Sequence, residues 1–263
     1  MKKIILLTLI LTTPAWAFTL NNSGGAKFGS NEVTLNVEGS EECANIGLSN
    51  QELLDAAFEA MDEFWNRAPT SNLKIIKGEV VQITADFHNL SMCTNTTGSC
   101  IARTSLKVPS GIMLSCNDNA TDFSSTRILG LTYPNNTSGR TIVGSLVMIN
   151  DKAGTQFASK TYHEKKTIIA HEVGHALGLG HSPVEDSLMF YLHNPNRQYL
   201  GQDDIDGISF LYPAEQPKIS SCGTISTDQN KNAPQRGALL TMLGMFLGML
   251  IARVLFFKRS SSL

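Results

Sequence analysis

The chain has 263 residues, a formal net charge of −2 and 42% hydrophobic residues. These values indicate a folded domain with room for further segments, and they exclude a chain that is disordered throughout. A nearly neutral chain without a basic stripe also argues against nucleic-acid binding.

Residues 1–17 have the layout of a secretory signal peptide. Lys2 and Lys3 precede an apolar run at 4–11, and small residues at Ala15 and Ala17 offer a cleavage site. We therefore expect export of the protein and cleavage after Ala17. The alternative is an N-terminal helix or strand that is buried in the domain.

The next part of the chain predicts one strand and one helix. Residues 18–32 are rich in Gly and Asn and are expected to form a flexible segment. Residues 33–37 alternate apolar and polar side chains, as a half-buried strand does. Apolar residues at helical spacing over 51–67 predict a helix, with Ser49 or Asn50 as its N-cap.

The middle of the chain is expected to be mostly extended. Strand candidates lie at 73–76, 80–83, 127–133 and 141–150. The Pro-, Asn- and Gly-containing segment 134–139 predicts a turn between the last two. Residues 88–124 are rich in Asn, Ser, Thr, Gly and Cys, so we expect loops with short strands there.

Two further helices are predicted near the end of the domain. Thr161 and Glu164 have the spacing of a capping box and begin the first helix, which Gly178 and Gly180 end. The second covers 203–211, where two aspartates in the first turn complement the helix dipole.

The residues after the domain have the pattern of a linker followed by a membrane anchor. Residues 218–236 form a polar linker, and the apolar run 237–257 reaches the roughly 20 residues of a transmembrane helix. The basic tail 258–263 favours a cytoplasmic C-terminus, with the domain outside. A sorting tail that is cut off or exchanged after export is the alternative.

Export makes disulfide bonds chemically possible for the five cysteines. Four of them lie in the domain and allow three pairings, of which Cys93 with Cys100 would close a short loop. Cys222 lies in the linker and is the expected odd thiol.

The segment 171–181, HEVGHALGLGH, carries the predicted chemistry. His171 and His175 are four residues apart on a helix, so both imidazoles can bind one ion. Gly178 lets the chain turn so that His181 becomes the third ligand. Three histidines and an open fourth position are typical of a catalytic zinc site, where Glu172 would act as general base on a zinc-activated water. An accidental motif on an ordinary helix is disfavoured by the added Gly178 and His181.

This motif, with Met189 downstream, resembles the metzincin signature. The eight-residue spacing from His181 to Met189, and the segment 201–208 (GQDDIDGI), resemble the matrixin branch. The resemblance implies an α+β catalytic domain over 33–217. Its fold would be a twisted five-stranded mixed sheet, mostly parallel with an antiparallel edge strand, and three helices.

The resemblance also implies roles for individual residues. The edge strand, at Leu129 and Gly130, would pair with an extended peptide substrate. Met189 would lie in a turn beneath the zinc as a packing base. Phe190-Tyr191-Leu192 follows Met189, where matrixins usually have Tyr-Pro, and Met-x-Tyr resembles astacins and serralysins. In those branches the tyrosine can stabilise the transition state, and Tyr191 would do the same here. An aromatic residue in a pocket wall or in the core is the interpretation we prefer for Tyr191.

The chain departs from the family pattern in two further respects. The cysteine-switch motif PRCGxPD is absent, and 18–32 is too short for a propeptide domain, so latency through the usual thiol is not expected. The open alternatives are a short N-terminal segment or an unknown inhibitor protein that covers the cleft. His88, His163 and His193 do not form the HxD arrangement of a second, structural zinc. We expect one zinc ion, and calcium sites are not assigned.

The leading prediction is a zinc metalloendopeptidase that cleaves protein or peptide substrates outside the cytoplasm. A zinc amidase acting on a non-protein substrate is the alternative among enzymes. A catalytically silent adhesion or binding module is the alternative outside them, and the intact Glu172 disfavours it. An intramembrane protease is disfavoured because the metal motif lies far from the apolar run.

Overall fold

The computed structural model describes residues 18–21, 24–95 and 100–214. The expected signal peptide, the linker, the apolar run, the basic tail and Cys222 lie outside these ranges. Among the helices in the described ranges, none has both the length and the apolar character that a bilayer crossing requires.

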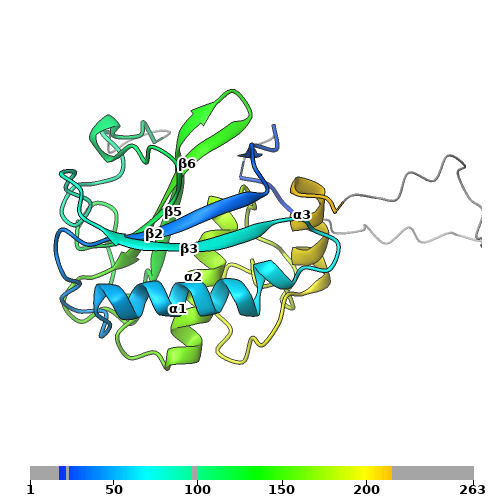
Figure 1. The fold of residues 1–263 in the computed structure, drawn as a ribbon. Helices are drawn as coiled ribbons and strands as arrows, with labels where there is room; N and C mark the ends of the chain where they lie inside the picture. Colours follow the sequence, from blue (N-terminus) through cyan, green and yellow to red (C-terminus); the bar gives the residue numbers. More distant parts are fainter. Residues whose placement is uncertain (1–17, 22–23, 96–99, 215–263) are drawn as a thin grey trace, which may run out of the picture. The chain divides into compact units, whose positions relative to one another are not determined.

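A mixed sheet forms the centre of the domain (Figure 1). Its strands are β1 (Lys27–Phe28), β2 (Glu32–Glu38), β3 (Lys74–Val81), β4 (Gly111–Asn117), β5 (Gly130–Ser138) and β6 (Thr141–Asn150). The main strands follow the order β5-β6-β4-β2-β3, and the short β1 pairs with the start of β6. All pairs are parallel except β5 with β6. The mostly parallel sheet with an antiparallel edge strand is confirmed, and β1 is an addition to the expected five strands.

Three α-helices lie in the described part of the chain, as expected. They are α1 (Asn50–Glu63), α2 (Tyr162–Ala176) and α3 (Gln202–Leu211), and single 3-10 turns cover Trp65–Arg67 and Thr104–Leu106. α1 packs against α2, β2 and β3, and α2 also packs against β5 and β6 (Figure 1). The main core, with the fully buried Trp65, lies between these helices and the sheet. A smaller core around Phe87 and Phe123 lies beneath loops on the other face of the sheet.

The helix starts follow the predicted capping residues. Ser49 caps α1 and exchanges hydrogen bonds with Glu52, which gives a capping box. Thr161 and Glu164 form the same arrangement at the start of α2. Each box satisfies backbone N–H groups that the first turn of a helix leaves without partners. The residue at which α2 begins is therefore determined by local contacts, and α2 carries the metal motif.

Several predicted boundaries are wrong. The helix predicted over 51–67 ends at Glu63 and continues as a 3-10 turn, and the two strand candidates at 73–83 form the single strand β3. The turn predicted over 134–139 is confined to Gly139 and Arg140, because β5 continues to Ser138. Pro134 is tolerated in β5 because this is an edge strand, with irregular pairing between Tyr133 and Asn136.

The segment expected to be flexible, 18–32, is largely paired where the structure describes it. Leu20 forms a β-bridge with Leu179, and the two residues of β1 pair with β6. The Thr19 carbonyl accepts a hydrogen bond from the Gly180 N–H, and the Asn21 side chain donates to the His175 carbonyl at 2.6 Å. The Gly and Asn content of this segment predicted flexibility, but backbone N–H and C=O groups can pair whatever the side chains are. The prediction of a flexible segment is therefore wrong for these residues.

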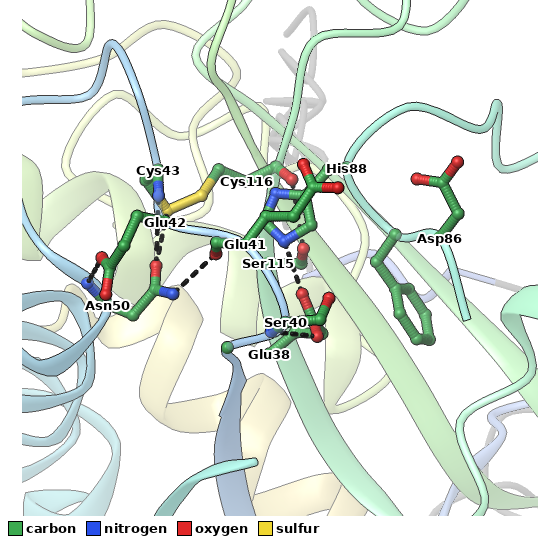
Figure 2. Close-up of polar contacts among 12 residues, drawn as sticks. Glu38, Ser40, Glu41, Glu42, Cys43, Asn50, Asp86, His88, Ser115 and Cys116 are labelled. Atoms are coloured by element: carbon green, nitrogen blue, oxygen red, sulfur yellow. Dashed lines mark hydrogen bonds and ion pairs between the residues drawn. A yellow bond between two sulfur atoms is a disulfide. The ribbon is translucent and has the colours of Figure 1, made fainter. Parts of the chain in front are cut away.

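Two disulfide bonds show which of the three possible cysteine pairings the domain adopts. Cys93 bonds to Cys100, as the short loop suggested, and Cys43 bonds to Cys116 on β4. Figure 2 shows the second bond beside Asn50, whose side chain donates to the Glu41 carbonyl at 2.7 Å. In the same view, His88 lies 2.5 Å from the buried carboxylate of Glu38 at the end of β2. These contacts join the loop before α1 to the centre of the sheet.

Removing the Cys43–Cys116 bond by Cys43→Ser with Cys116→Ser is expected to lower the free energy of unfolding by about 2–5 kcal/mol. The bond spans 73 residues, whereas Cys93–Cys100 spans 7. Under the chain-entropy model, Cys93→Ser with Cys100→Ser should cost about 2 kcal/mol less. Urea unfolding of both variants without reductant measures the difference. Equal losses would contradict the entropic argument.

Candidate metal centre

The metal motif occupies the end of α2 and the turn that follows. His171 and His175 lie on successive turns of the helix, and Gly178 then takes a φ of 112° that returns the chain toward them. As a result, the ligand atoms offered by His171, His175 and His181 all lie within 4.8 Å of one another. The structure thus brings together the three histidines that the sequence singled out.

Backbone carbonyls orient two of these imidazoles. His171 Nδ1 lies 2.7 Å from the Leu188 carbonyl, and His175 Nδ1 lies 2.8 Å from the Leu179 carbonyl. A carbonyl only accepts, so each Nδ1 must carry the proton, which leaves the Nε2 lone pair for a metal. Three imidazoles whose ligand atoms lie this close together fit a catalytic zinc ion.

Burial favours the neutral state that metal binding requires. Loss of hydration, together with the charge of a protonated His171, lowers the pKa of His175 to about 3. Burial lowers the pKa of His181 as well. Neither imidazole therefore needs to lose a proton at neutral pH before it binds a metal.

Met189 is buried next to Gly174 of α2. Its side chain is 2% exposed. A Cβ at Gly174, between His171 and His175 on α2, would lie 2.3 Å from Met189 Sδ and 2.7 Å from the Trp65 ring. A side chain at this position would displace Met189 or the Trp65 ring. Gly174 therefore permits the close approach of Met189 to α2.

Asp204 at the start of α3 fixes the turn that contains Met189. Its carboxylate accepts hydrogen bonds from the Ser187 hydroxyl and from the N–H groups of Leu188, Met189 and Gly201. Burial raises the pKa of Asp204, and these donors oppose the shift. Since the Leu188 carbonyl also accepts from His171, Asp204 supports the first histidine through this turn. From the sequence, Asp204 was expected only to complement the dipole of the last helix.

Glu172 lies against the edge strand β5. Thr132 Oγ1 is 2.7 Å from Glu172 Oε2 and 3.0 Å from the Glu172 carbonyl. At Gly130, a Cβ would lie 2.7–2.9 Å from the end of the Glu172 side chain. Burial raises the pKa of the carboxyl, while a charge on His171 and the Thr132 hydroxyl lower it. Sequence reasoning did not identify Thr132.

A cavity of about 440 Å³ opens beside Glu172. Residues 128–130, including the predicted Leu129 and Gly130, line one wall, and Thr167 and Ile168 of α2 line another. The segment 187–195 forms a further wall. Tyr191 belongs to this wall and is 61% exposed, so the interpretation of Tyr191 as a core aromatic residue is wrong. A cleft between an edge strand and a metal centre suits an extended chain.

The other three histidines do not belong to the three-histidine group, although His193 lines the cavity. His88 bonds to Glu38, His163 to the Arg197 carbonyl, and His193 lies 3.4 Å from Glu164. Each thus has a separate protein partner.

Comparisons with known proteins agree with this geometry. The family model described as matrixin matches residues 44–213. Stromelysin-1 of Mus musculus is 34% identical over 99 residues, which is 35% of this chain and 20% of that protein. Metalloendoproteinase 5-MMP of Arabidopsis thaliana is 46% identical over 54 residues, and matrix metalloproteinase-19 of Homo sapiens over 56 residues at the same identity. The matches cover at most a fifth of the length of these three relatives.

Proposed function

The chain belongs to the matrixin family of zinc metalloendopeptidases, and on this premise we propose that it hydrolyses peptide bonds in extended segments of extracytoplasmic proteins. One observation carries the proposal. Three imidazoles, two of them oriented by backbone carbonyls, lie with a buried carboxylate at the wall of a cavity that an edge strand borders. An enzyme needs this combination, whereas metal binding alone needs neither the carboxylate nor the cavity.

His171 and His175 would bind the zinc ion through Nε2, and His181 would be the third ligand. When bound, zinc supplies a Lewis acid that acidifies a water and polarises the carbonyl of the scissile bond. Glu172 accepts the proton of the attacking water and passes it to the leaving amine. Burial of this carboxyl raises its pKa, which makes it a better base than an exposed glutamate.

The substrate would bind as an added strand on β5. The Leu129 and Gly130 backbone lies at the cavity, and β5 has no strand partner on its outer side among the described residues. Main-chain hydrogen bonds to such an edge fix an extended peptide and leave alternate side chains to enter pockets. The residue after the scissile bond would then enter the 440 Å³ cavity. Tyr191, on the cavity wall, would contact the substrate, or stabilise the transition state if its side chain turns inward.

Export and anchoring complete the proposal. They rest on the layout of residues 1–17 and the apolar run 237–257, which would leave the domain outside the cytoplasm. Oxidation of Cys43 with Cys116 and of Cys93 with Cys100 supports an exported domain, since disulfides persist in oxidising compartments.

The direct test is digestion of a denatured protein mixture by the purified, zinc-loaded protein, beside a chelated sample. New peptide ends that form only in the zinc-loaded sample are the expected result, and their sequences give the preference around the cut. If the protein binds one equivalent of zinc and produces no new ends, the peptidase assignment fails. A silent binding module or a zinc amidase would then be the better reading.

A further inference from the structure

Thr132 lies directly behind the proposed general base. Its hydroxyl donates one proton, and its nearer acceptor is the Glu172 carboxylate at 2.7 Å. A hydrogen bond to an ionised carboxylate is stronger than one to a neutral carbonyl, so the carboxylate is the preferred partner over the Glu172 carbonyl at 3.0 Å. Thr132 is also β-branched, which restricts its χ1 on a strand and keeps the hydroxyl in place.

Gly130 adds a steric condition on the same face of β5. Residues two apart on a strand point to one side, and the pairing of β5 with β6 is regular from Gly130 to Tyr133. Leu131 packs instead against the smaller core on the other face. A Cβ at Gly130 would lie 2.7 Å from Glu172 Cγ and 2.9 Å from Oε1. The absence of a side chain at Gly130 therefore makes the space that the carboxylate fills.

We propose that Gly130 and Thr132 form a seat that fixes the orientation of the Glu172 carboxylate. This Glu172 seat (Gly130 and Thr132) binds Oε2 and leaves Oε1 to take the proton. The proposal rests on the peptidase function given above. Thr132 is a positioning residue, because it acts through Glu172 and does not line the cavity.

The benefit of the seat is preorganisation. A glutamate has three side-chain torsions, and an unrestrained carboxylate would spend part of its time away from the reacting water. Strand β5 thus has two roles in the reaction. Its edge pairs with the substrate, and the face that carries Gly130 and Thr132 orients the Glu172 carboxylate. Removal of the hydroxyl should lower kcat and leave substrate binding nearly unchanged.

The kinetic test compares three variants of the full-length, zinc-loaded protein. Thr132→Val removes the hydroxyl and keeps the branched shape, and we expect kcat to fall about 10- to 100-fold, as for loss of a hydrogen bond to a charged group. KM should stay within about twofold, because the substrate does not touch the hydroxyl. Thr132→Ser should recover most of kcat. Thr137→Val is the matched control on the same strand, where the side chain is exposed, and it should match the wild type.

A structural test does not depend on activity. Crystal structures of the zinc-loaded wild type and Thr132→Val should show one Glu172 conformer in the first and a displaced or multiple carboxylate in the second. Gly130→Ala should displace the same carboxylate, with zinc affinity unchanged in all variants. An unmoved carboxylate in Thr132→Val, an unchanged kcat, or failure of Thr132→Ser to recover activity would overturn the seat. A wild type that cuts no peptide would instead overturn the peptidase function, and the crystal structures would still decide the seat.

Discussion

Replacing Glu172 with glutamine is expected to lower kcat/KM for peptide hydrolysis by roughly a thousandfold and to leave zinc binding intact. General base catalysis contributes about 10²- to 10⁴-fold, and this carboxylate is the acidic side chain on the cavity wall in the described structure. Glutamine has the same shape, and its amide oxygen can still accept the hydrogen bond from Thr132. The variant therefore loses the proton acceptor and little else.

The measurement is steady-state kinetics on a peptide identified from the protein digest, with the zinc content of each sample determined in parallel. Glu79→Gln is a suitable control, because Glu79 is an exposed residue on β3, which lies at the opposite edge of the sheet from β5. It should retain wild-type activity. A Glu172→Gln protein with full zinc content and activity within tenfold of the wild type would exclude Glu172 as the general base.

Replacing His175 with alanine is expected to abolish stable zinc binding, and with it activity. Loss of an outer hydrogen-bond partner of a metal ligand costs about 10- to 100-fold in affinity, so loss of one of three protein ligands should exceed that. The wild type should also unfold at a higher temperature with zinc than with a chelator, since a ligand that binds only the folded state stabilises it. His175→Ala should lose most of this zinc-dependent difference.

His163→Ala is the matched control for this experiment. His163 is on the same helix and bonds to the Arg197 carbonyl, away from the three-histidine group. Its replacement is expected to leave zinc affinity unchanged. Zinc competition titration and thermal unfolding with and without chelator give the two readouts. An unchanged zinc affinity in His175→Ala would show that the ion binds elsewhere.

The parts of the site that the sequence predicted are those encoded by local spacing. His171 and His175 share a helix face, Gly178 permits the turn, and Thr161 with Glu164 marks the start of α2. Each of these depends on residues a few positions apart, so the periodicity of a helix and the conformational freedom of glycine suffice to predict them. The Met189 position came from the family resemblance, and in the structure this residue is buried.

The unpredicted parts depend on contacts between distant segments. Thr132 meets Glu172 only because β5 packs against α2, and Asp204 meets the Met189 turn only because α3 returns to it. β4 was not located within 88–124 for a different reason. As an interior strand of the sheet it is buried almost throughout, and its Ser115 and Asn117 are buried too, so it lacks the alternation that reveals a half-exposed strand.

The carboxylate of Asp204 also makes completion of the site depend on the docking of α3. Ribosomes release a chain from its N-terminus, so the three histidines emerge before Asp204 does. Until Asp204 arrives, the N–H groups of Leu188 and Met189 lack their acceptor, and the carbonyl that orients His171 is not fixed. The nascent chain can thus present all three imidazoles without a completed site. The orientation of His171 is therefore complete only when α3 has docked against the turn that contains Met189.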